Sequence, residues 1–132
     1  MNARILVVDD STSIRRMIVA CMAHCAYTVA SAEDGAAGYA LAQAEPFDLV
    51  ITDQVMPVMD GMSLIRALRA LPAYSHTPIL MLTTEAGTES REEARAAGAT
   101  GFLAKPFDPD GLMQSVQQLL ELYPSASSRC AS

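Results

Sequence analysis

The sequence has no long hydrophobic run. Its longest weakly polar stretch, Met17–Ala32, is interrupted by His24, Thr28 and Ser31 and is too short to cross a bilayer comfortably. The N-terminal segment has too brief an apolar run, and too early an acidic pair, for a secretory signal. We therefore expect a cytoplasmic protein that is not inserted in a membrane.

Basic side chains are scarce. Lysine and arginine number nine against fifteen acidic residues, which gives a net charge of −6 and an isoelectric point near 4.7. A chain with this balance is repelled by phosphate-rich surfaces, so nucleic acid and anionic membranes are excluded as non-specific partners. Eight of the nine basic residues are arginine, and Lys105 is the only lysine.

Cysteine is scarce as well, and the three cysteines cannot all pair with one another. Cys21 and Cys25 are one helical turn apart on an apolar face. This spacing favours small core side chains in a reducing compartment over a disulfide. Cys130 lies in the C-terminal tail and is expected to be a free thiol.

The chain has enough apolar residues for one folded domain. Of its 132 residues 51% are hydrophobic and 18% are charged, which excludes disorder over most of the length. We expect the domain to cover residues 1–123. The remaining segment, 124–132, lacks apolar periodicity and is predicted to be a disordered tail or a linker stub.

Short apolar runs alternate with segments of helical spacing. The runs are nearly continuous in hydrophobicity, as in parallel strands covered on both faces; they are Ile5–Val8, Tyr27–Ala30, Leu49–Ile51, Ile79–Leu82 and Phe102–Leu103. Helices are expected at Ile14–Cys25, Asp34–Glu45, Leu64–Leu71, Glu89–Ala97 and 108–122. This alternation predicts an α/β fold, in which a five-stranded parallel sheet has helices on both faces and right-handed crossovers.

Polar side chains follow four of the predicted strands. Asp9 and Asp10 follow the first strand, Asp53 the third, Thr83 the fourth and Lys105 the fifth. In an open parallel sheet the carboxyl ends of the strands share one edge, where ligands bind. Any one of these aspartates alone is more often a helix cap or a turn residue. Their joint placement at one edge indicates a site.

Three carboxylates at one edge need a counter-charge. At a separation of ~4 Å each pair repels by about 4 kcal/mol at an effective dielectric of about 20. Mg²⁺ prefers oxygen ligands and typically takes carboxylates together with waters and a phosphate oxygen. The oxygens of a phosphoryl group on an aspartate could then contact a metal ion, an ammonium group and a hydroxyl group. The constellation therefore favours phosphoryl transfer.

Four segments resemble the receiver domains of bacterial response regulators: Ile5–Ser11, Asp53–Gly61, Leu82–Thr84 and Ala104–Phe107. The resemblance extends over essentially the whole of Ile5 to Tyr123. It implies a flavodoxin-like fold with strand order 2-1-3-4-5. It also implies a phosphoprotein of a two-component system, which is not an enzyme apart from catalysing its own phosphorylation and dephosphorylation.

The resemblance implies roles for the acidic residues. Asp53 corresponds to the phosphoacceptor, which a histidine kinase would phosphorylate. Asp9 and Asp10 correspond to the Mg²⁺-binding pair, and Asp53 and the backbone carbonyl of Val55 would complete the protein ligands.

The resemblance also implies a switch. Thr83 and Lys105 correspond to the hydroxyl and the ammonium that engage the phosphoryl group, and Phe102 takes the aromatic switch position, with a core side chain as the alternative. The helix at 89–97 can bury only alanine, so we expect it to be held weakly and to shift. Together with Phe102 and the helix at 108–122 it would form the face for a downstream protein target.

The sequence is compatible with several biological roles. Because almost nothing follows Tyr123, a stand-alone regulator of chemotaxis or motility is the leading expectation. A phosphorelay shuttle and a receiver fragment of a longer regulator are the alternatives. From another class, a Mg²⁺-dependent aspartyl-phosphate phosphatase would use similar groups, but its Asp-x-Asp pattern is not matched by Asp9-Asp10-Ser11. A flavin-binding module fits less well, because Asp9 and Asp10 would repel the cofactor phosphate.

Overall fold

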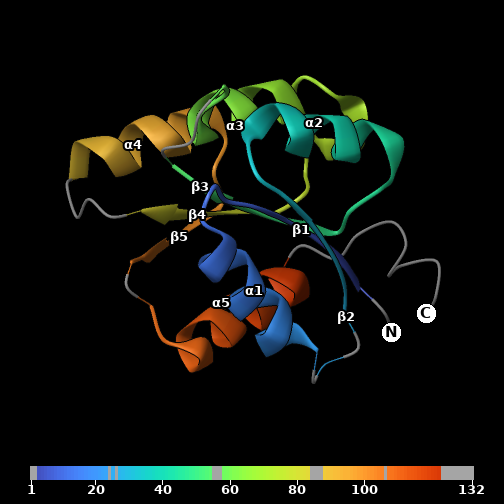
Figure 1. Ribbon diagram of the computed structural model, residues 1–132. Helices are drawn as coiled ribbons and strands as arrows, with labels where there is room; N and C mark the ends of the chain where they lie inside the picture. Colours follow the sequence, from blue (N-terminus) through green and yellow to red (C-terminus); the bar gives the residue numbers. More distant parts are fainter. Residues whose placement is uncertain are drawn as a thin grey trace.

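Parallel strands form a five-stranded sheet in the order β2-β1-β3-β4-β5 in the computed structural model of the chain (Figure 1). The strands are β1 (Ala3–Val8), β2 (Tyr27–Ala32), β3 (Leu49–Asp53), β4 (Ile79–Thr83) and β5 (Gly101–Ala104). The expected fold class and strand order are therefore confirmed. The structure describes residues 3–23, 25, 27–54, 58–83, 88–105 and 107–122. The predicted tail at 124–132 lies outside these ranges, so it stays a prediction.

Strand burial follows the order of the sheet. The central strands β3 and β4 are buried throughout, whereas the edge strands β2 and β5 are mostly half-exposed. Both central strands extend beyond their apolar residues. Asp53 is the last residue of β3 and Thr83 the last of β4, and each still pairs with the neighbouring strand. Two of the predicted site residues are thus fixed by sheet hydrogen bonding rather than placed in loops.

Helices cover both faces of the sheet (Figure 1). On one face lie α2 (Gly35–Ala44), α3 (Gly61–Arg69) and α4 (Thr88–Ala97), and on the other lie α1 (Thr12–Met22) and α5 (Pro109–Leu122). Two apolar clusters result, one on each side of the sheet. Leu6, Val50 and Met81 contribute to the cluster beneath α2, α3 and α4, while Ile5, Ile51 and Leu82 contribute to the other.

Polar side chains cap the starts of four helices. Ser11 accepts a hydrogen bond from the backbone N–H of Ile14 at the start of α1, and Asp60 accepts one from Ser63 at the start of α3. Asp34 and Asp108 do the same for α2 and α5. Each cap satisfies a backbone donor that the first turn leaves unpaired, so these residues set where the helices begin.

The predicted C-terminal ends of α1 and α3 were wrong. The α1 helix ends at Met22, so Cys25 lies beyond it, and Cys21 and Cys25 are only partly buried. The larger side chain of Met22 takes the core position instead. The α3 helix ends at Arg69, and Leu71 has extended backbone (φ −86°, ψ 125°) ahead of a 3₁₀ helix, η1 (Pro72–Tyr74). Proline disfavours helical backbone in the residue before it, which explains the early end.

Glycine has a low helix propensity, yet Gly38 lies within α2. A Cβ atom at this position would lie 2.7 Å from Cγ2 of Val8 in β1. Glycine therefore lets α2 pack closely on the sheet, which outweighs its low helix propensity.

The C-terminal end of α4 is closed by Gly98, whose φ of 123° favours glycine. The backbone N–H of Gly98 donates to the carbonyl of Arg95, and that of Ala99 donates to Ala94, at 3.0 and 2.9 Å. These two bonds form a Schellman motif, which satisfies carbonyls at the helix end. None of the described helices has the length and hydropathy of a membrane span.

Candidate functional site

The carboxyl edge of the sheet brings two aspartates into contact with the only lysine. Lys105 Nζ lies 3.0 Å from Asp9 Oδ2 and 3.1 Å from Asp53 Oδ1. Asp9 is 0% and Asp53 7% exposed, so both carboxylates have lost most of their water. An ammonium shared between them offsets part of that desolvation. Three of the predicted site residues therefore meet as expected.

Asp9 is held in place by the start of α1. Its Oδ1 accepts a hydrogen bond from the backbone N–H of Ser11 at 2.9 Å, and Arg15 donates to its backbone carbonyl. The backbone N–H of Asp9 also donates to Ala32 at the end of β2, at 3.1 Å. The carboxylate is thus fixed before any ligand arrives.

Asp53 is positioned by the end of β3 and by the close approach of α3. The N–H of Gln54 donates to Asp53 Oδ1 at 2.9 Å, and the N–H of Gly61 donates to the carbonyl of Gln54 at 2.9 Å. A Cβ atom on Gly61 would overlap the carbonyl oxygen of Asp53. In the Asp60-Gly61 pair, the aspartate caps α3 and the glycine lets that helix start against the site.

The acidic cluster has the donor set of a hard cation site. One carboxylate oxygen from each of Asp9, Asp10 and Asp53 lies within 4.8 Å of the others, and Asp10 is exposed to solvent. Three carboxylates and one ammonium leave the cluster formally anionic. An all-oxygen, anionic set of this kind fits Mg²⁺. Val55, whose carbonyl was predicted to be a further ligand, lies outside the described residues.

Charge and burial set the protonation of the pair. Burial raises the pKa of Asp53 and the charge of Asp9 raises it further, although Lys105 and the N–H of Gln54 act to lower it. Burial acts to lower the pKa of Lys105, but its hydrogen bonds and the charges of Asp9 and Asp53 outweigh this and raise it. The lysine therefore stays protonated. Ionisation of Asp53 costs free energy in the folded state, and a bound cation would reduce that cost.

Thr83 lies at the end of β4, next to the acidic pair. It is 2% exposed, and its Oγ1 donates to Gln54 Oε1 at 2.8 Å. The backbone N–H of Lys105 donates to the carbonyl of Thr83 at 2.7 Å, so β4 also positions the lysine. Gln54 was not predicted to belong to the site. A polar residue after a strand is common, and nothing in the sequence signals which way its side chain turns.

Phe102 lies in β5, half-buried against the cluster beneath α4. The guanidinium carbon of Arg95 lies 5.7 Å from the centre of its ring, within the range of a cation–π contact. The ring therefore lies between β5 and α4, as the core alternative requires. Its role as a switch stays a prediction.

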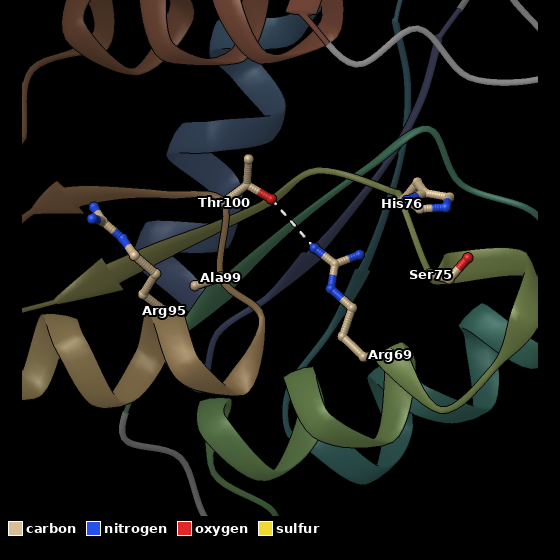
Figure 2. A pocket seen from close by; sticks show the side chains of 6 residues that line it. All are labelled: Arg69, Ser75, His76, Arg95, Ala99 and Thr100. Atoms are coloured by element: carbon tan, nitrogen blue, oxygen red, sulfur yellow. Dashed lines mark hydrogen bonds between the residues drawn. The ribbon is translucent and has the colours of Figure 1, made fainter.

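A second polar group of residues lies at the opposite edge of the sheet, at the amino ends of β4 and β5. A hollow of about 420 Å³ there is lined by Arg69, Ser75, His76, Arg95, Ala99 and Thr100 (Figure 2). The guanidinium of Arg69 donates to the carbonyl of Gly98 at 2.7 and 3.1 Å, to that of Tyr74 at 2.6 Å and to Thr100 Oγ1 at 3.3 Å. Arg95 points away from Arg69 (Figure 2). The two arginines therefore do not converge on a ligand position.

Known proteins are similar to this chain over nearly its whole length. The family model described as response regulator receiver domain matches residues 5–117. The chemotaxis protein CheY of Pseudomonas aeruginosa is 36% identical over 119 residues, which cover 89% of this chain and 96% of that protein. CheY-3 of Vibrio cholerae is 34% identical over 121 residues, which cover 91% and 93%.

Solved structures agree with the sequence relatives. The chemotaxis response regulator CheY4 of Vibrio cholerae has a TM-score of 0.88 and 45% identity, and the match covers 91% of this chain and 100% of that one. The receiver domain of the Pseudomonas aeruginosa sensor histidine kinase PA1611 was solved with a magnesium ion in its active-site cleft. It has a TM-score of 0.84 at 30% identity, over 92% of this chain and 99% of that one.

Proposed function

This chain belongs to the family of response regulator receiver domains, and we propose that it accepts a phosphoryl group on Asp53 from a histidine kinase. The observation that carries the proposal is the pairing of Lys105 with both carboxylates, at 3.0 Å from Asp9 and 3.1 Å from Asp53. A compact ammonium between the nucleophile and a second acid is suited to the charge that develops on a transferred phosphoryl group.

In the proposed reaction a carboxylate oxygen of Asp53 attacks the phosphorus of a phosphohistidine. A P–O bond forms, the P–N bond breaks, and the imidazole nitrogen keeps the electron pair. Lys105 and the N–H of Gln54 both engage Oδ1 of Asp53. Among the described residues Oδ2 is therefore the oxygen left to attack. The rigid end of β3 presents it in a fixed direction, which reduces the entropy lost on reaching the transition state.

Asp9, Asp10 and Asp53 would hold Mg²⁺, with the carbonyl of Val55 as a proposed further ligand. The support is the set of carboxylate oxygens within 4.8 Å of one another in an anionic cluster. When bound, Mg²⁺ neutralises charge on the phosphoryl oxygens. Asp9 is oriented for this by Ser11 and Lys105, while the exposed Asp10 lies on the side that faces solvent.

Once phosphorylated, the chain would change its protein contacts. Thr83 and Lys105 would hydrogen-bond the phosphoryl oxygens, and the movement of Thr83 would reposition α4. The face formed by α4, Phe102 and α5 would then bind a downstream protein. The relatives named as chemotaxis proteins support a role in chemotaxis or motility. We propose that this role is carried out in the cytoplasm. The similarity to a receiver domain of a sensor kinase keeps a phosphorelay shuttle as the second candidate.

Intact-protein mass spectrometry after incubation with acetyl phosphate and Mg²⁺ tests the proposal. We expect one added phosphoryl group on the wild type, none on Asp53→Asn and none after Mg²⁺ is removed with a chelator. Asp48→Asn is a matched control, because Asp48 is also a buried aspartate but follows α2 at the other edge of the sheet. An unmodified wild type, under conditions that label another receiver domain, would refute the proposed function.

A further inference from the structure

A hydrogen bond joins Thr83 to the side chain of Gln54. Thr83 Oγ1 donates to Gln54 Oε1 at 2.8 Å, and Thr83 is 2% exposed. A hydroxyl has one proton to donate, so this proton cannot go to the amide and to a phosphoryl oxygen at the same time. The bond to Gln54 therefore competes with the contact that phosphorylation requires of Thr83.

The backbone of Gln54 is fixed on three sides. Its N–H donates to Asp53 Oδ1 at 2.9 Å and to the carbonyl of Leu82 at 3.1 Å, and its own carbonyl accepts from Gly61 at 2.9 Å. The backbone from which the amide reaches Thr83 is thus held by β3, β4 and α3. A Thr83 hydroxyl that donates to a phosphoryl oxygen on Asp53 has to release Gln54 Oε1, because it has only one proton to donate.

We propose that Gln54 is a positioning residue, which holds the Thr83 hydroxyl in the unphosphorylated arrangement and so opposes its engagement with the phosphoryl group. The inference rests on the proposed function of Asp53 and Thr83. Removal of the amide oxygen removes one hydrogen bond from the unphosphorylated arrangement only. The affinity for a phosphoryl analogue should then rise by about 2- to 10-fold, the range that one neutral hydrogen bond gives.

The test is a titration of the full chain with beryllofluoride in the presence of Mg²⁺, followed by ¹⁹F NMR of the bound fluoride. Gln54→Met keeps the length of the side chain and removes the amide. We expect half-saturation at about 2- to 10-fold lower beryllofluoride than in the wild type. The same substitution in a Thr83→Ala background should change nothing, because the hydroxyl that Gln54 holds is gone. Gln43→Met, on the exposed side of α2, controls for the introduced methionine.

Unchanged or weaker binding by Gln54→Met overturns the inference, and so does an equal gain in both backgrounds. Gln54→Leu takes the place of Gln54→Met if thermal unfolding shows that the methionine variant does not fold. A wild type that binds no beryllofluoride refutes the proposed function and this inference with it. A wild type that binds normally, with no difference in the variant, refutes only the role of Gln54.

Discussion

The two edges of the sheet use their charged side chains in opposite ways. At the carboxyl edge, Lys105 is bonded to two carboxylates, and a third aspartate lies close by. At the amino edge, Arg69 is bonded to the backbone carbonyls of Gly98 and Tyr74. Backbone carbonyls cannot change their charge, so the contacts of Arg69 tie α3, η1 and α4 together permanently. The contacts of Lys105 depend on the charge of Asp53, which a cation or a phosphoryl group alters.

The polar contacts at the amino edge hold the fold, whereas those at the carboxyl edge serve the proposed reaction. Substitutions at the amino edge should lower stability and leave phosphorylation intact. Substitutions at the carboxyl edge should impair phosphorylation or the binding of its analogues, with little loss of stability or even a gain. Variants at both edges separate these outcomes.

The largest effect is expected for Lys105→Arg at the carboxyl edge. A guanidinium keeps the charge, but it is wider and planar, and one nitrogen cannot lie between Asp9 and Asp53 as the ammonium does. We expect a loss of affinity for beryllofluoride of about 100-fold or more, because the charge-assisted hydrogen bonds to both Asp9 and Asp53 are misplaced. The ¹⁹F NMR titration measures it, with Arg16→Lys on the exposed side of α1 as the control. Wild-type affinity in Lys105→Arg would contradict the role of the lysine.

Next in size is Arg69→Met at the amino edge. This change removes hydrogen bonds to Gly98, Tyr74 and Thr100 and leaves carbonyls unsatisfied. The free energy of unfolding should fall by about 2–3 kcal/mol in urea titrations. Labelling of Asp53 by acetyl phosphate should be unchanged at a temperature where the variant is folded. Arg66→Met, at an exposed position of the same helix, should cost less than about 0.5 kcal/mol. An equal loss of unfolding free energy in Arg69→Met and Arg66→Met would show that the hydrogen bonds of Arg69 do not hold the fold.

A smaller effect of opposite sign is expected for Asp53→Asn in buffer without Mg²⁺. Burial and the charge of Asp9 raise the pKa of Asp53 above its unfolded value, so its ionisation destabilises the folded state. The penalty is fully present above the folded pKa and disappears as the pH falls below the unfolded value. The unfolding temperature of Asp53→Asn should therefore exceed that of the wild type by a few degrees at neutral pH, and the gain should vanish in acid. Calorimetry at both pH values checks this, and a destabilised variant at neutral pH would contradict it.

The smallest effect is expected in the loop that leads from Asp53 to α3. Val58 has a φ of 69° and is 83% exposed, so a β-branched residue is strained there and packs against little. Val58→Asn should raise the free energy of unfolding by about 0.5–1 kcal/mol, because asparagine tolerates left-handed backbone. Val19→Asn, at an exposed valine in α1, should give no gain. A gain of equal size in both variants would show that backbone strain is not the cause.

The carboxyl edge could be predicted from the sequence because it depends on topology. Parallel strands end at one edge, so Asp9, Asp53 and Lys105 had to approach one another once the strands were identified. The caps Ser11 and Asp108 were predictable because each acts within one turn of its own helix.

The remaining contacts depend on geometry that periodicity does not encode. The carbonyl partners of Arg69 come from the ends of α4 and η1, and η1 itself was not predicted. The bond between Gln54 and Thr83 depends on one side-chain conformation. Cys25 and Leu71 were assigned to helices because apolar spacing continues past the true helix ends. The backbone conformation that Pro72 imposes on Leu71 outweighs that spacing at the end of α3.

The hydrogen bonds from Arg69 to the carbonyl of Gly98 affect how α4 can move. They fix the C-terminal end of α4, and a rigid helix fixed at one end rotates about that end. The ten residues of α4 make an arm of about 15 Å from Gly98 to Thr88. A small change in the direction of the α4 axis therefore displaces Thr88 much more than Arg69. Thr88 is the end of α4 that is nearer to Thr83 in the sequence. If the Thr83 hydroxyl moves on phosphorylation as proposed, α4 would rotate about the amino edge, and the displacement of its Thr88 end would be the change that a partner protein recognises.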